Sequence, residues 1–273
     1  MEIKILSPVW GHEHIEQREF LDKVRLAGYD GIDTWLPDDV KQKHELYNYL
    51  QKQEMVIVTH QHQATGNTFE EFKSSFVKKL AICAEPNPIL INSHTGKDYF
   101  SLEQNLQLID VAQEFSEKSG IKITHETHRG RIGYCPQMID HIFSVRSDFL
   151  IAADFSHWVC VTESFLENFS SILEEAILRT RHVHARVGYE QGPQVADPRA
   201  PEWGYALNRF LNWWDKIVKA NDDKGADILT FTTEFGPPPY MQTQPFSGRT
   251  VADQFELNCF MKDLLRDRYA RYC

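Results

Sequence analysis

Residues 121–128 read I-K-I-T-H-E-T-H, an apolar β-type run that stops at Glu126. The same change from apolar to polar residues recurs in three later segments. These are F-L-I-A-A-D-F-S-H at 149–157, R-H-V-H-A-R-V at 181–187 and I-L-T-F-T-T-E-F-G at 228–236. Their polar residues are Asp154, His184 and Glu234. Because functional side chains of parallel α/β folds stand where strands end, the pattern predicts one site built from four strand ends.

Strand-like runs continue over the whole chain, with segments of helical period between them. The expected strands are 3–6, 30–34, 55–60, 88–93, 121–126, 149–154, 180–185 and 228–234. The expected helices are 16–26, 40–53, 69–84, 102–118, 136–145, 163–178, 203–220 and 251–269. Alternating strands and helices are typical of a parallel sheet built from βα units. Since 273 residues is close to the roughly 250 of one barrel, we predict a single (β/α)8 TIM barrel over residues 1–273.

Local signals support several of these boundaries. Asp38 or Asp39 precedes the second expected helix, Ser101 precedes the fourth and Gly120 follows it, as helix caps do. The longest irregular stretch, residues 186–201, follows the seventh strand and is rich in Gly, Pro and charge. Loops longer than about 12–15 residues are usually functional, so we expect this loop to border the site.

Composition limits the partners and the compartment. A formal net charge of −10 disfavours nucleic acid, which is bound by basic surfaces. No apolar stretch approaches the ~20 residues that cross a bilayer, and residues 1–10 lack the apolar core of a secretory signal. The five cysteines are scattered and lack C-x-x-C spacing, which indicates reduced thiols. We expect a cytoplasmic protein with neither membrane nor nucleic-acid partners, and the sequence leaves a homo-oligomer open.

Strand alternation predicts that the four polar strand ends face one another. Residues two apart share a face of a strand, so Glu126 shares its face with Thr124, opposite Ile123. Three carboxylates and an imidazole meeting in a poorly solvated space repel one another unless a cation is present. Their mixed oxygen and nitrogen donors suit Mn²⁺, Co²⁺, Mg²⁺ or Zn²⁺. Each residue alone is better explained by local hydrogen bonds, but together they predict a divalent-metal site made of Glu126, Asp154, His184 and Glu234.

The order of these motifs resembles the xylose isomerase-like TIM barrels, which include sugar isomerases, ketose 3-epimerases and endonuclease IV-type repair enzymes. That family has a Glu at one strand end, then D-x-x-H, H-x-H and a final Glu. The matching residues here are Glu126, Asp154 with His157, His182 with His184, and Glu234. A-G-Y-D-G-I-D at 27–33 is similar to the family's second strand, although Asp33 stands where a Glu is usual.

The resemblance implies an enzyme that isomerises or epimerises a small sugar or sugar acid. It implies that a metal polarises the substrate's carbonyl while a proton moves at the adjacent carbon, through an enediolate. By the same resemblance, Glu126 and Glu234 are both ligands and the catalytic pair that exchanges the proton. Asp154 and His184 complete the ligand set. His157 then contacts a substrate oxygen or completes the metal shell.

Further polar and aromatic side chains follow the expected strand ends. The residues that we expect to bind the substrate are His157, His60, His62, His94, His128, Arg186, Trp10 and Trp158. Imidazoles bond to sugar hydroxyls, and aromatic faces pack against the C–H side of a sugar ring; loop packing is the alternative for the aromatic residues. Arginines gather at the same end of the chain's strands, namely Arg129, Arg131, Arg186 and Arg199. Their number favours an anionic or phosphorylated substrate.

Departures from the family pattern leave the reaction open. His128 stands where xylose isomerases have a Lys, which disfavours a hydride shift, and Arg186 stands where ketose 3-epimerases usually have a Glu. A lyase of the inosose dehydratase type, an endonuclease IV-like hydrolase and a non-catalytic carbohydrate binder are the alternatives. The repair enzymes need a D-x-H motif where this chain has D-P-R at 197–199. No glycine-rich nucleotide motif is present, so we expect no organic cofactor site.

Overall fold

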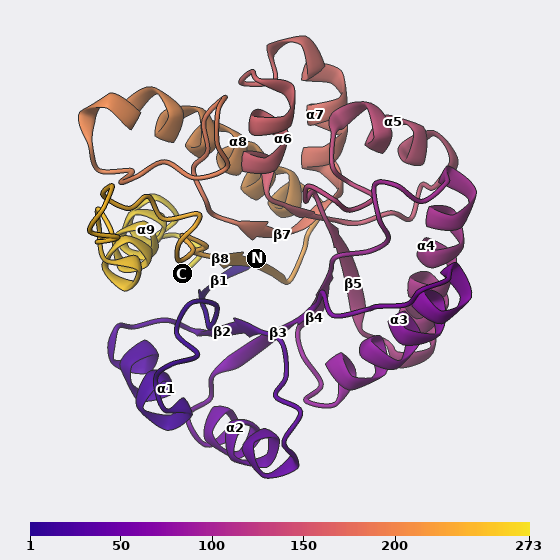
Figure 1. Ribbon diagram of the computed structural model, residues 1–273, viewed down its shortest axis with the longest axis horizontal. Helices are drawn as coiled ribbons and strands as arrows, with labels where there is room; N and C mark the ends of the chain where they lie inside the picture. Colours follow the sequence, from indigo (N-terminus) through magenta and orange to yellow (C-terminus); the bar gives the residue numbers. More distant parts are fainter.

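The computed structural model describes residues 1–273, and its eight strands lie around a common axis with the helices outside them (Figure 1). The strands are β1 Glu2–Pro8, β2 Gly31–Thr34, β3 Val56–Gln61, β4 Leu90–Ser93, β5 Lys122–Glu126, β6 Ile151–Ala153, β7 Thr180–His184 and β8 Ile228–Thr232. Each pairs in parallel with its neighbours, and β8 closes on β1, where Ile5 lies opposite Phe231. The predicted (β/α)8 barrel is confirmed.

Nine α-helices surround the barrel. They are α1 Gln17–Leu26, α2 Val40–Lys52, α3 Phe69–Ala84, α4 Leu102–Ser119, α5 Pro136–Val145, α6 Phe155–Thr162, α7 Ser170–Arg179, α8 Gly204–Asp223 and α9 Gln254–Arg268. Two 3-10 turns, η1 Glu167–Phe169 and η2 Pro201–Trp203, precede α7 and α8. None of the nine helices combines the length and apolar composition that a bilayer crossing requires.

The predicted helix caps are present. The Asp39 carboxylate accepts a hydrogen bond from the Gln42 backbone N–H at 2.8 Å at the start of α2. Ser101 and Gln104 form a reciprocal capping box at the start of α4, and Gly120 ends that helix with φ of 73°. Only a residue without a side chain adopts this left-handed conformation at low cost.

The segment after β6 differs from the expected single helix at 163–178. Helix α6 begins directly after Asp154, whose carboxylate accepts a hydrogen bond from the Ser156 backbone N–H at 3.1 Å. The helix ends at Glu163, and α7 begins only at Ser170, because Glu163 and Leu166 have φ of 48° and 64°. The first five residues of α6 are all buried and none of its eight residues is charged, so it lacks the charged face that reveals a helix in a sequence.

Apolar packing lies mainly between the strands and the helices, where one cluster holds 48 buried residues. The barrel interior instead has a small separate cluster of Leu6, Val58 and Leu90. Above this cluster the interior is polar and includes Asp33 and Asn92, both buried. The interior of this barrel therefore brings buried polar groups to its C-terminal end.

His125 should make the fold sensitive to acid. It faces away from the barrel axis, stacks on Phe149 at 4.3 Å between ring centroids and bonds Thr95 Oγ1 at 2.6 Å. Burial, with a smaller contribution from Arg146, lowers its pKa from 6.5 to about 3. The unfolded chain therefore binds the extra proton between these two pH values, so stability falls as the pH falls below 6.5.

We expect His125→Asn to remove this contribution. The loss of unfolding free energy between pH 7 and pH 5 should be smaller than in the native protein by about 2 kcal/mol. Urea unfolding at the two pH values measures it. The matched control is His44→Asn, because His44 is exposed on α2. An unchanged difference between the two pH values in His125→Asn would contradict the assignment.

Candidate functional site

Four polar strand ends meet at the C-terminal end of the barrel. Glu126 ends β5, Asp154 follows β6, His184 ends β7 and Glu234 lies two residues beyond β8. One donor atom from each residue lies within 4.8 Å of the others, and all four side chains are buried. The structure therefore brings together all four residues that the sequence singles out, while their role as metal ligands stays a prediction.

The donor atoms of this cluster are suited to a cation. His184 Nδ1 lies 2.8 Å from Glu234 Oε2 and 3.6 Å from Glu126 Oε2. Both His184 Nδ1 and Glu234 Oε2 are buried, and the alignment of their 2.8 Å contact is that of an ion pair rather than of a hydrogen bond. Burial opposes protonation of His184, but Glu234 and Glu126 outweigh it and raise its pKa well above the usual value. The three carboxylates thus favour positive charge, which a divalent metal supplies.

Asp33 holds the other side of the His184 ring. Its Oδ2 lies 3.2 Å from Nε2 of His184 and 3.2 Å from Nε2 of His182, and it accepts a hydrogen bond from Thr232 Oγ1 at 2.9 Å. Burial disfavours its ionised form, but the bonds to His182 and His184 outweigh this and lower its pKa. A carboxylate behind a ligand imidazole fixes the ring and raises its basicity. The sequence signalled Asp33 only as a departure from a family pattern.

Asp33→Asn is expected to weaken metal binding by about 10–100-fold while the barrel stays folded. The amide has the shape of the carboxylate but cannot accept from both imidazoles as a charged group. Titration with Co²⁺, followed by visible absorption and chelator competition, measures the affinity without any assay of turnover. Asp38→Asn, at an exposed residue before α2, is the matched control. Equal Co²⁺ affinity in Asp33→Asn and the native protein would refute the positioning role.

Arg186 is a resident cation within the acidic cluster. Its guanidinium bonds the Asp154 carboxylate, lies 3.3 Å from Glu234 Oε2 and contacts His157 Nε2 at 3.0 Å. Although burial opposes its charge, Asp154 and Glu234 raise its pKa, so it stays protonated. Burial raises the pKa of Asp154 to about 6, against the opposing effect of Arg186. One divalent ion together with Arg186 would balance the three carboxylate charges of the site.

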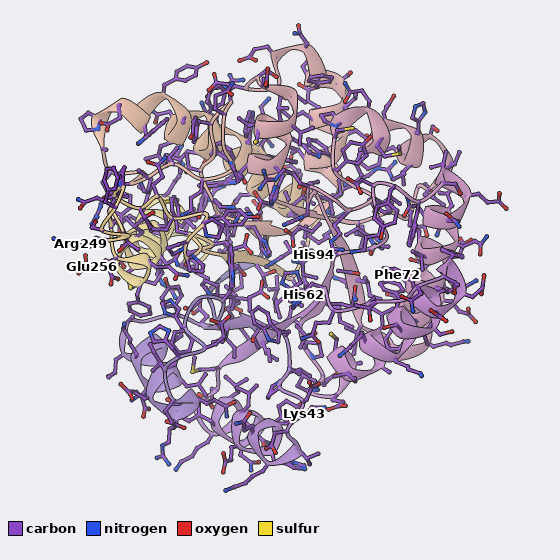
Figure 2. All side chains as sticks on the ribbon, in the orientation of Figure 1. Lys43, His62, Phe72, His94, Arg249 and Glu256 are labelled. Carbon is purple, nitrogen blue, oxygen red and sulfur yellow. The ribbon has the colours of Figure 1, made fainter.

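One oxygen of Glu126, Oε2, is contacted by residues of β3 and β4 as well as by His184. Asn92 Nδ2 donates to its Oε2 at 2.7 Å, and Nε2 of His94 and His60 lie 3.1 and 3.5 Å from the same atom. Burial opposes its ionisation, but His94 and His184 outweigh burial and lower its pKa. Figure 2 shows His62 and His94 near the centre of the barrel, in contrast to Lys43 and Glu256 at its periphery. Asn92 gave no signal in the sequence, because asparagine at a strand end is common.

A cavity of about 170 Å³ lies over this cluster. Its lining residues are Trp10, Trp35, His60, His62, His94, Glu126, His128, Arg186, Glu234 and Tyr240. Six of the residues expected to bind substrate are among them, so the structure places these six where a ligand can reach them. Tyr240 was missed because it lies in the long loop after β8, six residues from Glu234. Its ring meets Trp10 edge-on at 5.1 Å and lies 4.7 Å from the Arg186 guanidinium.

Solved structures match the chain along its length. A "D-tagatose 3-epimerase-like protein" superposes with a TM-score of 0.64 at 16% identity, covering 100% of this chain and 98% of that one. The probable 3-DHS dehydratase AsbF from Bacillus anthracis gives 0.61 at 14%, covering 97% and 99%. The 3-keto-D-glucoside 4-epimerase YcjR from E. coli gives 0.59 at 12%, covering 97% and 100%. The chain therefore shares the TIM-barrel fold of these three structures.

Comparison of the sequence alone gives no match. No protein-family model matches the chain, and no curated protein matches its sequence. The sequence of this chain is 12–16% identical to those of the three solved structures. Likeness at this level establishes the fold alone. The chemistry of the site therefore has to be inferred from the residues themselves.

Two residues that we expected to bind substrate, Trp158 and His157, do not line the cavity. Trp158 is completely buried in α6, donates its indole N–H to the Gly133 carbonyl at 2.8 Å and packs beside Phe155, so the expectation that it binds substrate is wrong. His157 is also fully buried and does not line the cavity. It accepts a hydrogen bond from Arg129 Nε at 3.0 Å, and the other face of its ring contacts Arg186. The helix that starts at Phe155 turns Trp158 into the core, whereas His157 stays beside the cluster, where one donor atom each of His157, Glu126 and His128 lies within 4.8 Å of the others.

The long loop after β7 is tied to the loop after β8. Tyr189 and Gly192 form an antiparallel bridge within it. Gln194 is buried and donates to the Gly236 carbonyl at 3.3 Å, while it accepts from the Gly236 N–H at 2.7 Å. A side chain at Gly236 would collide with Trp10, since its Cβ would lie 2.2 Å from the indole. These contacts join the loop to Gly236, which packs against the cavity-lining Trp10, and within residues 186–201 Arg186 lines the cavity.

Proposed function

We propose that the chain is a divalent-metal-dependent isomerase or epimerase, which moves a proton next to a carbonyl of a small sugar or sugar acid. The observation that carries the proposal is the convergence of Glu126, Asp154, His184 and Glu234 within 4.8 Å beneath a cavity. Two of the structural neighbours named above are epimerases or epimerase-like, and one is a dehydratase. An epimerase and a dehydratase on this fold support the assignment to proton-transfer chemistry.

The four side chains divide into two kinds by their access to the cavity. Glu126 and Glu234 line it, whereas Asp154 and His184 lie behind them. All four would hold the metal, which when bound supplies a Lewis acid for the carbonyl oxygen. Only the two glutamates can touch a substrate carbon, so we assign the proton transfer to them. Asp33 and Arg186 would keep the ligands in place.

The cavity lining favours an uncharged polyol over a phosphate. Burial lowers the pKa of His62 and of His128 to about 4 in each case, so both offer neutral imidazoles that can donate to and accept from hydroxyl groups. Trp10 and Trp35 add apolar faces. Arg186 is the only lysine or arginine in the lining, and it already bonds Asp154. This arrangement argues against the phosphorylated substrate that the number of arginines favours in the sequence.

Hydrogen exchange tests the proposal. Ketoses, inososes and sugar acids are incubated in deuterated water with protein loaded with Mg²⁺, Co²⁺ or Zn²⁺ in turn, and NMR is recorded after removal of protein and metal. Deuterium at the carbon beside the carbonyl, lost with EDTA and restored by metal, is the expected result. Loss of a hydroxyl group would identify the lyase alternative. No exchange with any compound, despite a bound metal, would refute enediolate chemistry and favour a hydrolase or a binding protein.

A further inference from the structure

A second cavity, of about 400 Å³, lies at the opposite, N-terminal end of the barrel. It is lined by the first residues of β4, β5 and β8 and by the end of α8. It shares no residue with the cavity over Glu126 and Glu234. Its polar lining consists of Lys122, Arg181, Asn221, Lys224, Asp227 and Thr230. This end of a TIM barrel ordinarily serves stability alone.

Three cations gather around this cavity without carboxylate partners. Arg181 is half-buried and forms no ion pair, unlike the half-buried Lys43, Arg146 and Arg179 of this acidic chain. Lys122 and Lys224 are exposed at the rim of the cavity and form no ion pair either. Arg181 donates to the carbonyls of Leu178 and Thr180 at 3.1 and 2.7 Å, and Lys224 donates to that of Leu178 at 2.8 Å. These bonds hold both side chains in position but leave their charge uncompensated. Asp227 is the only carboxylate in the lining.

A buried acceptor without a partner lies beside the cations. Asn221 is completely buried, and its Nδ2 donates to the carbonyls of Thr180 and Ile217 at 3.0 and 2.9 Å. These two bonds fix the amide, so Oδ1 is left with no hydrogen-bond partner. A buried unpaired acceptor costs about 1–3 kcal/mol. A ligand hydroxyl would satisfy it, whereas a bare anion would not.

We propose that this cavity binds a phosphate monoester of a small polyol. The phosphate would lie among Lys122, Arg181 and Lys224, and a hydroxyl group would donate to Asn221 Oδ1. The apolar side chains of Leu90 and Ile228 suit the carbon skeleton of such a ligand. The site is separate from the metal cluster, so the bound ester is an effector or a stabilising ligand rather than the substrate.

Calorimetric titration of the full-length, metal-loaded protein with glycerol 3-phosphate tests this site. Lys122→Gln and Lys224→Gln should each weaken binding by about tenfold, because each removes a charge-assisted contact. Lys122 is exposed and makes no bond within the chain, so its variant should fold even if Lys224→Gln does not. Lys41→Gln, at an exposed lysine of α2, is the matched control for net charge and should bind normally. Inorganic phosphate should bind more weakly than the ester, and glycerol should not bind.

Three kinds of result would overturn the proposal. Equal affinity in the native protein and in Lys122→Gln, or no binding at all, would remove the anion site. Loss of binding in Glu234→Gln, or after metal removal, would place the phosphate on the metal cluster instead. Equal affinity for inorganic phosphate and for the ester would remove the hydroxyl contact with Asn221 and leave a simple anion site in place of the proposed one.

Discussion

Glu234→Gln is expected to leave the barrel folded and to lower turnover by about 10²–10⁴-fold, the contribution of one positioned acid–base group. The amide fills the same space, but it cannot take a proton. It is also a weaker metal ligand, so metal affinity should fall as well. Glu234 Oε2 pairs with His184 at 2.8 Å and with Arg186 at 3.3 Å. The amide oxygen of glutamine can still accept from both cations, so the fold should be kept.

Turnover and deuterium exchange, both measured at saturating metal, separate the loss of chemistry from the loss of metal. Metal content and thermal unfolding are recorded for the same samples. Glu202→Gln, at an exposed glutamate of η2, is the control and should behave as the native protein. Full metal occupancy together with unchanged turnover in Glu234→Gln would remove Glu234 from the catalytic pair.

Arg186→Met is expected to destabilise the metal-free protein by about 3–5 kcal/mol, as is usual when one partner of a buried ion pair is removed. Methionine fills much of the space, but the carboxylate of Asp154 then loses its cation and Glu234 loses a neighbouring positive charge. A divalent metal should recover part of this loss, because it compensates the same carboxylates. Urea unfolding with and without Mg²⁺ measures both effects.

Two further variants control this experiment. Arg199→Met removes a half-exposed arginine that pairs with Asp197, and the expected change is at most about 1 kcal/mol. Arg186→Lys keeps the charge but loses the planar donor geometry, so it should lie between the native protein and Arg186→Met. Native stability of Arg186→Met in the absence of metal would show that Asp154 does not depend on Arg186.

Much of the fold could be predicted because its signals are local. A strand end such as Glu126 is visible as an apolar run followed by a carboxylate, and alternation along the strand gives the direction of its side chain. Four such ends define the cluster without any knowledge of loops. The helix caps at Asp39 and Ser101 are equally local, since they depend on residues within one turn.

The rest of the site depends on contacts between distant segments. The position of Trp158 just after the sixth strand predicted a residue at the rim of the barrel. In the structure the helix that begins at Phe155 directs its side chain into the core. Tyr240 reaches the cavity only through the path of a long loop, which no periodicity describes. Arg186 could be placed near the mouth from its spacing to His184, but its bond to Asp154 depends on how two neighbouring strands present their ends. Asp33 acquires its partners only when the barrel closes.

The contacts of Asp33 also determine hydrogen-bond directions through the barrel. Nδ1 of His184 faces the acidic cluster and Nε2 faces Asp33. With a metal ion on Nδ1, the one remaining ring proton would lie on Nε2, directed toward Asp33. As an ionised carboxylate accepts only, His182 must also donate from Nε2, and burial lowers the pKa of this ring so that it is neutral. Its Nδ1 must then accept from the Thr230 hydroxyl at 2.7 Å. The tautomers of two histidines thereby orient a hydroxyl group that borders the N-terminal cavity.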